Sequence, residues 1–233
     1  METRLQLSAF LTSEFSINID KQTSLLKKLK EISGYELLPR VMKGYSVDLK
    51  EGKMIEEQSH SFVTSDGKCE IVLIPGRVDV NLNMIQNNQE IEFLKKALEI
   101  ILKELSLNSN RLAYNKYDIK NIGEINFEEV EMYKKMNSPV KYYNTKKLEE
   151  CNIRYSTLQN IKIDEKEEKL NVITEILTVK EINNKVNGIM IHLDINTIQE
   201  YTASRFSYAN IEEFCVKVTA ISNAITSSIE GWG

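Results

Sequence analysis

Two short polar runs contain the residues of this sequence best suited to binding or catalysis. Each run has a cation, an aspartate and an asparagine at alternate positions, namely Arg77, Asp79 and Asn81, and His192, Asp194 and Asn196. Residues two apart project to the same side of a β-strand, so each set lines one strand face. If the two strands faced each other across a pseudo-twofold axis, the carboxylates and amides would converge on a hard cation or a polar ligand. The alternative is two solvated outer faces of antiparallel sheets, hydrogen-bonded to cross-strand neighbours.

A stretch rich in tyrosine and lysine is a second candidate, in this case as an interaction surface. Its members are Tyr114, Tyr117, Tyr133, Lys134, Lys135, Tyr142, Tyr143, Lys146 and Lys147. Aromatic rings interleaved with cations suit single-stranded nucleic acid, a protein interface or a plain solvated face. The net charge of -4 disfavours nucleic acid. A protein partner or self-association is therefore favoured over nucleic acid.

Residues for metal or covalent chemistry are scarce. The two histidines, His60 and His192, have no metal-binding spacing, and neither a nucleophile-elbow motif nor a glycine-rich phosphate loop occurs. The cysteines Cys69, Cys151 and Cys215 are far apart, and we expect Cys69 and Cys215 to be buried and unreactive. The sequence thus predicts no catalytic residue, no metal and no cofactor, which favours a protein that is not an enzyme.

Composition is that of an ordered globular protein. The chain has 233 residues, of which 42% are hydrophobic and 27% charged, enough to bury a sizeable core without metal or disulfide. The first residues lack the basic and apolar regions of a signal peptide, and no apolar run is long enough to span a membrane. Together with the odd, scattered cysteines, these features predict a cytoplasmic location and no membrane partner.

Hydrophobic periodicity predicts the elements of the first half. Residues 5–19 alternate, most cleanly at 15–20, which indicates a strand. Apolar residues at helical spacing predict helices over 23–33 and 87–105. Turn signals between 35 and 84 predict three or four antiparallel strands.

The second half repeats this order. Strands are expected at 111–119, 152–163, 170–179 and 189–195, and helices at 127–136 and around an apolar stripe from 214 to 229. We therefore predict an α+β fold of two tandem strand-helix-meander-helix repeats, residues 1–108 and 109–233, with antiparallel sheets backed by helices.

Three segments carry a resemblance to a known family. The run 71–83, the strand 111–118 after a long helix, and the closing strand 193–196 resemble a sporadically distributed, functionally uncharacterised bacterial family. The tryptophan usual near the start of the family's middle helix is absent, and residues 87–93 stand in its place. The resemblance brings no catalytic residue, and the family's patchy distribution implies mobile-element or defence genes.

The sequence therefore favours a non-enzymatic binding or interaction protein, such as a partner, inhibitor or sensor in a bacterial or phage conflict system. The alternative is an enzyme or ligand-binding protein that acts on a small polar or phosphorylated molecule through the two Asp-x-Asn strand faces.

Overall fold

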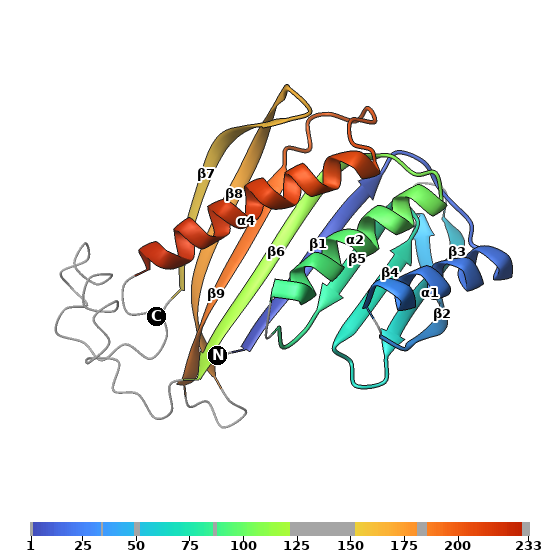
Figure 1. Cartoon of the computed structure of the whole chain (residues 1–233), viewed down its shortest axis with the longest axis horizontal. Helices are drawn as coiled ribbons and strands as arrows, with labels where there is room; N and C mark the ends of the chain where they lie inside the picture. The colour runs from blue at the N-terminus through green and yellow to red at the C-terminus, as the bar shows by residue number, and fades with distance from the viewer. Residues whose placement is uncertain are drawn as a thin grey trace.

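The computed structural model describes residues 2–33, 35–48, 52–85, 88–121, 152–180 and 186–229. Within these ranges the chain forms one nine-stranded antiparallel sheet with helices on one side (Figure 1). The strands are β1 (Glu2–Leu11), β2 (Leu37–Asp48), β3 (Lys53–Thr64), β4 (Cys69–Ile74), β5 (Arg77–Leu82), β6 (Ser109–Asn121), β7 (Asn152–Ile163), β8 (Lys166–Lys180) and β9 (Val186–Thr197). The helices are α1 (Ile19–Ser33), α2 (Asn88–Glu104), the 3-10 helix η3 (Tyr208–Asn210) and α4 (Ile211–Ser228).

The first strand of the chain lies at the centre of the sheet. The strand order is β2-β3-β4-β5-β1-β6-β9-β8-β7, and β1 pairs with β5 on one side and β6 on the other. The predicted α+β class is confirmed. The separate sheets expected of two repeats are instead one sheet, because β1 and β6 form a ladder along the whole length of β1. The predicted boundary at 108/109 falls where β6 begins and stays a prediction.

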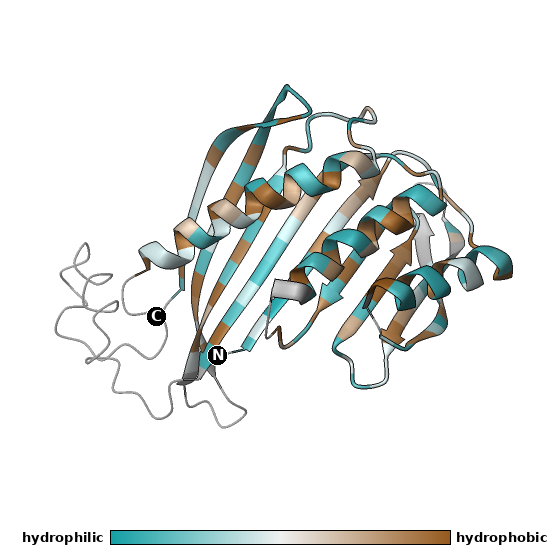
Figure 2. Ribbon diagram, viewed as in Figure 1, coloured by the Kyte–Doolittle hydropathy of each residue, from teal (hydrophilic) through white to brown (hydrophobic). Residues whose placement is uncertain are grey.

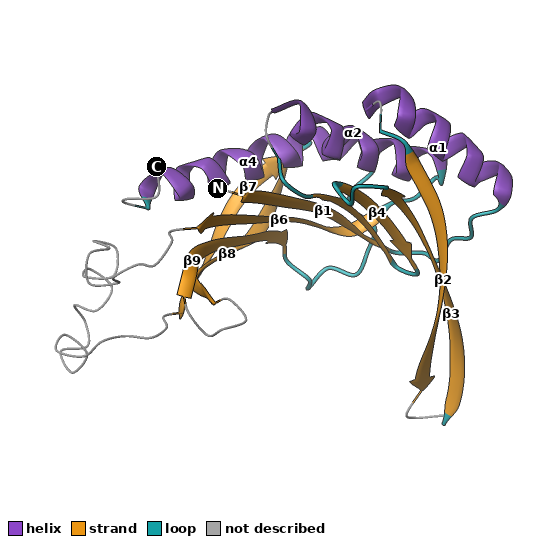
Figure 3. Ribbon diagram, turned by 90° about the horizontal axis from the view of Figure 1, so that it is seen from below, coloured by secondary structure: helices purple, strands orange, loops and turns teal. Residues whose placement is uncertain are grey.

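The helices cover one face of the sheet (Figure 3). Helix α2 packs on β5 and β1, α4 packs on β6, and α1 packs on α2. Leu5, Leu7 and Ala9 of β1 are buried in the core beneath this layer, and Figure 2 shows hydrophobic and hydrophilic residues alternating along the central strands. Each large aliphatic side chain buried in this way stabilises the fold by about 1.5–3 kcal/mol.

The start of the chain differs from the prediction. The strand predicted as the first element is confirmed as β1, but it ends at Leu11 and helix α1 begins at Ile19. The cleanest alternation, at 15–20, is therefore not part of a strand. Phe15 and Ile17 alternate because this connection packs every second side chain against the core. The helix begins early because the Asn18 side chain accepts a hydrogen bond from the backbone N–H of Lys21 (2.9 Å), as an N-cap does.

Most other elements agree with the sequence. Four strands occupy 35–84, and the remaining expected strands and long helices are present with ends shifted by a few residues. The charged turn between β7 and β8 has left-handed backbone at Asp164 and Glu165 (φ 51° and 62°), as a tight hairpin requires. The helix expected at 127–136 lies outside the described residues.

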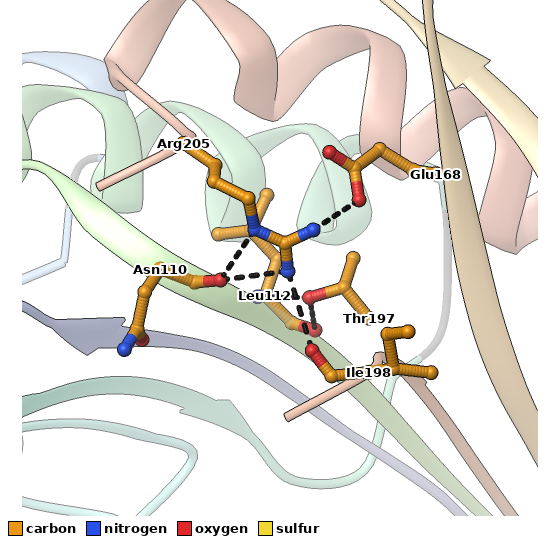
Figure 4. Close-up of polar contacts among 6 residues, drawn as sticks. All are labelled: Asn110, Leu112, Glu168, Thr197, Ile198 and Arg205. Carbon is orange, nitrogen blue, oxygen red and sulfur yellow. Dashed lines mark hydrogen bonds and ion pairs between the residues drawn. The ribbon is translucent and has the colours of Figure 1, made fainter. Parts of the chain in front are cut away.

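Arg205 anchors the connection between β9 and α4. Its Nε and one terminal nitrogen donate to the carbonyl of Asn110 at 3.1 and 2.9 Å, and the same terminal nitrogen donates to the carbonyl of Ile198 at 3.2 Å (Figure 4). The other terminal nitrogen forms an ion pair with Glu168 of β8. The two charged side chains are only 14% and 9% exposed. This one guanidinium therefore links three segments of the chain.

The surroundings of Arg205 hold it in place. The rings of Tyr201 and Phe206 lie 4.5 and 4.9 Å from the guanidinium carbon. Beside them, the Thr197 hydroxyl accepts a hydrogen bond from the backbone N–H of Leu112 (3.0 Å), which joins β9 to β6 (Figure 4). The corner is thus packed as well as hydrogen-bonded.

Replacing Arg205 by lysine should lower the free energy of unfolding by about 3 kcal/mol, because a single ammonium cannot reach both carbonyls and Glu168 together. Urea denaturation measures the change. Lys68→Gln is the control, since its ion pair with Asp66 is exposed and should contribute less than about 1 kcal/mol. Equal losses in the two variants would contradict the anchoring role.

Candidate binding surface

The sheet face opposite the helices, termed the open face, is largely polar. Since Leu5, Leu7 and Ala9 of β1 point to the helices, the alternate residues of β1 point to the other side. The registers then place polar residues of the neighbouring strands beside them. The central part of the open face consists of Gln6, Ser8 and Phe10 of β1, Arg77, Asp79 and Asn81 of β5, Arg111, Ala113, Asn115 and Tyr117 of β6, and His192, Asp194 and Asn196 of β9.

Both predicted triads lie on this one face. Strand β5 carries the first triad, with Asp79 opposite Ser8, and β9 carries the second, with Asp194 opposite Asn115. Strands β1 and β6 lie between them, so the triads are three strand spacings apart, about 14 Å. At that separation they share a surface without converging on a single cation. Among the described residues no group of three metal-binding side chains could hold a metal ion.

The first triad is tied to a pair of arginines. Arg77 donates from Nε to Asp79 Oδ1 at 2.7 Å, and Asp79 is 7% exposed. Arg77 and Arg111 flank Phe10, with guanidinium carbons 5.0 and 4.5 Å from the ring centroid. An aromatic ring between two cations holds both planar groups in fixed positions.

The second triad belongs to a hydrogen-bond network centred on His192. Its Nδ1 lies 2.9 Å from Glu175 Oε2, and its Nε2 lies 3.3 Å from Asn115 Oδ1. The ring stacks on Tyr117, with centroids 4.3 Å apart and planes within 3° of parallel. Next to it, the amide of Asn196 donates to Asp194 Oδ1 at 2.8 Å.

This network crosses five strands. Asn115 donates to Gln6 Oε1 on β1 (3.3 Å). Glu175 on β8 forms an ion pair with Arg154 on β7 (3.2 Å) in addition to facing His192 on β9. Each side chain thereby restricts the next, so the open face presents fixed donors and acceptors before any ligand arrives. Such a surface is suited to recognition of a polar partner.

Sequence reasoning missed several of these residues. Glu175, Asn115 and Gln6 join the triads only through the pairing of β8 with β9, β9 with β6 and β6 with β1. Alternation along each strand signals that they share a face with their neighbours two residues away. Which strands adjoin one another is decided by contacts between distant segments.

The tyrosine- and lysine-rich stretch divides into three parts. Tyr114 is 4% exposed, and burial raises its pKa above the usual value, so it belongs to the core. Tyr117 lies on the open face beside His192. The other seven members, Tyr133, Lys134, Lys135, Tyr142, Tyr143, Lys146 and Lys147, lie outside the described residues, and the surface they were expected to form stays a prediction.

The described cysteines are poor nucleophiles. Burial raises the pKa of Cys69 to about 12, with smaller contributions from Glu70 and Asp66. Cys215, also expected to be buried, is only partly so, but burial likewise raises the pKa of its thiol to about 12. At neutral pH both remain protonated thiols, and the thiolate is the reactive form.

Comparisons with known proteins assign no activity to this surface. No family model matches the chain, and a search of curated proteins finds no similar sequence. Among the described helices, none is both long enough and apolar enough to traverse a bilayer.

Alkylation should show that the thiols of Cys69 and Cys215 are unreactive in the native protein and reactive after unfolding. In the native protein at pH 8, Cys69 and Cys215 should resist iodoacetamide, because their pKa values of about 12 leave almost no thiolate. After unfolding in guanidinium chloride both should react fully. Mass spectrometry of the digested protein reads each site separately. Rapid labelling of either cysteine before unfolding would contradict the burial.

Proposed function

We propose that this chain is a non-enzymatic binding protein whose partner occupies the open face. The observation that carries the proposal is the chain of side-chain hydrogen bonds from Gln6 to Glu175, extended to Arg154 by an ion pair, which connects polar side chains across five strands. Fixed side chains lose little conformational entropy when a partner binds. The thiol chemistry of Cys69 and Cys215 offers no competing catalytic role.

The kind of partner follows from charge. With a net charge of -4, a second protein or a second copy of this chain is favoured over nucleic acid. The resemblance to the sporadically distributed bacterial family favours a partner, inhibitor or sensor in a bacterial or phage conflict system, and the scattered cysteines favour a cytoplasmic location.

An internal duplication accords with this proposal. On either side of the β1–β6 ladder, β5, β4 and β3 follow in the same order as β9, β8 and β7. Arg77 and His192 oppose the aromatic residues Phe10 and Tyr117 of the two central strands. This arrangement supports two repeats at 1–108 and 109–233, each contributing half of the binding surface.

The second candidate is binding of a small polar or phosphorylated molecule through the two Asp-x-Asn faces. The position of both triads on the open face favours it. A small molecule would occupy one triad, whereas a protein would span both. Loss of binding in only one of Asp79→Ala and Asp194→Ala would identify the small-molecule case.

The location of the partner can be tested with two matched variants. Asn115→Arg places a bulky cation in the middle of the open face, whereas Val216→Arg places the same side chain on the outer surface of α4, where Val216 is 56% exposed. Co-purification from the host with quantitative mass spectrometry, and light scattering for self-association, should show at least a tenfold loss of partner for Asn115→Arg alone. Circular dichroism confirms that both variants fold. Equal retention by the two variants, or loss only for Val216→Arg, would refute the open face as the binding surface.

A further inference from the structure

Arg77, Phe10 and Arg111 form a row across the open face. They lie on the adjacent strands β5, β1 and β6 and are direct cross-strand partners. The guanidinium carbons are 5.0 and 4.5 Å from the phenylalanine centroid, and the strands that carry them lie on either side of β1. Two cations therefore share one aromatic ring, and each is held by a separate strand.

The charges in this row are not balanced. Arg77 is neutralised by Asp79, whose Oδ1 accepts from Nε at 2.7 Å. Arg111 makes no ion pair with any residue of the described ranges, and its Nε is buried without a hydrogen-bond partner there. Ser8, two residues before Phe10 on β1, lies on the same face, and its hydroxyl is also buried without a hydrogen-bond partner in the described residues. Arg111 thus lacks an ion pair within the described residues, and two buried donor groups, its Nε and the neighbouring Ser8 hydroxyl, are unused there.

Arg111 is partly buried, and no ion pair within the described residues offsets the hydration that its guanidinium loses. Burial, the largest effect, lowers the pKa of Arg111; Arg77 acts in the same direction and Asp194 partly opposes it. Arg205, an arginine with a structural role, differs from Arg111 because its guanidinium is paired with Glu168 and with two backbone carbonyls. An anionic ligand would supply the partner that the partly buried Arg111 lacks within the described residues.

We infer that the open face binds an oxyanion, a carboxylate or a phosphate group, seated between Arg77 and Arg111 above the ring of Phe10. The planar guanidinium presents paired N–H donors that match two oxygens of such a group. The phenylalanine supplies an apolar floor that keeps water from the ion pair and strengthens it. The inference rests on the proposed role of the open face and names the chemical group of the partner that this face selects.

The direct test observes the arginine Nε–H signals of the full-length, ¹⁵N-labelled protein by NMR. Sodium phosphate and sodium acetate are added in separate titrations, with sodium chloride at equal ionic strength as reference. The signals of Arg77 and Arg111 should shift and saturate with at least one oxyanion and not with chloride, whereas Arg205 should not respond. Tighter binding of phosphate would identify a phosphorylated ligand, and tighter binding of acetate an acidic side chain.

Two variants complete the test. Arg111→Gln should weaken oxyanion binding by about tenfold or more, the loss expected for one charge-assisted pair. Arg4→Gln is the control, because Arg4 lies on the same face of β1 and is paired with Glu2. The inference would be overturned if the NMR signals of Arg77 and Arg111 shift no more with phosphate or acetate than with chloride. It would also be overturned if Arg111→Gln and Arg4→Gln weaken oxyanion binding equally.

The outcomes separate this inference from the proposed function. If neither oxyanion binds while Asn115→Arg still abolishes partner binding, the oxyanion site between Arg77 and Arg111 is wrong and the open face remains the binding surface. If an oxyanion binds at Arg111 while Asn115→Arg keeps its partner, the oxyanion site is correct and the proposed surface for the protein partner is wrong.

Discussion

The pairing of β1 with β6 is the interaction on which the rest of the structure depends. It joins five strands on one side to four on the other and makes a single sheet. Asn115 reaches Gln6 across this ladder, and Phe10 lies between Arg77 and Arg111 because of it.

A second constraint follows from covering the sheet on one side only. The period of two in β1 sends Leu5, Leu7 and Ala9 into the core and leaves Gln6 and Ser8 on the opposite face. No helix of the described residues packs on that face, so its polar groups pair with one another or with solvent. Side-chain hydrogen bonds such as those of His192 and Glu175 meet this need, and they also order the surface for recognition.

Local patterns predicted much of the fold and one half of the site. The stripe from 91 to 105 identifies α2, and alternation at 77–81 and 192–196 places each triad on one strand face. Alternation at Phe15 and Ile17 wrongly predicted a strand, because both residues belong to a connection that packs alternate side chains against the core. Pairing between distant strands has no local signal, so one sheet in place of two, and the roles of Arg111 and Glu175, emerge only in three dimensions.

The central position of β1 also shapes how the protein folds. Residue 7 pairs with residue 80 on one side and residue 114 on the other, so both neighbours of this strand are made long after it during synthesis. Closing such large loops before any ladder forms carries a high entropic barrier, which slows folding. Until then the apolar residues of β1 remain without the strands and helices that bury them in the folded protein.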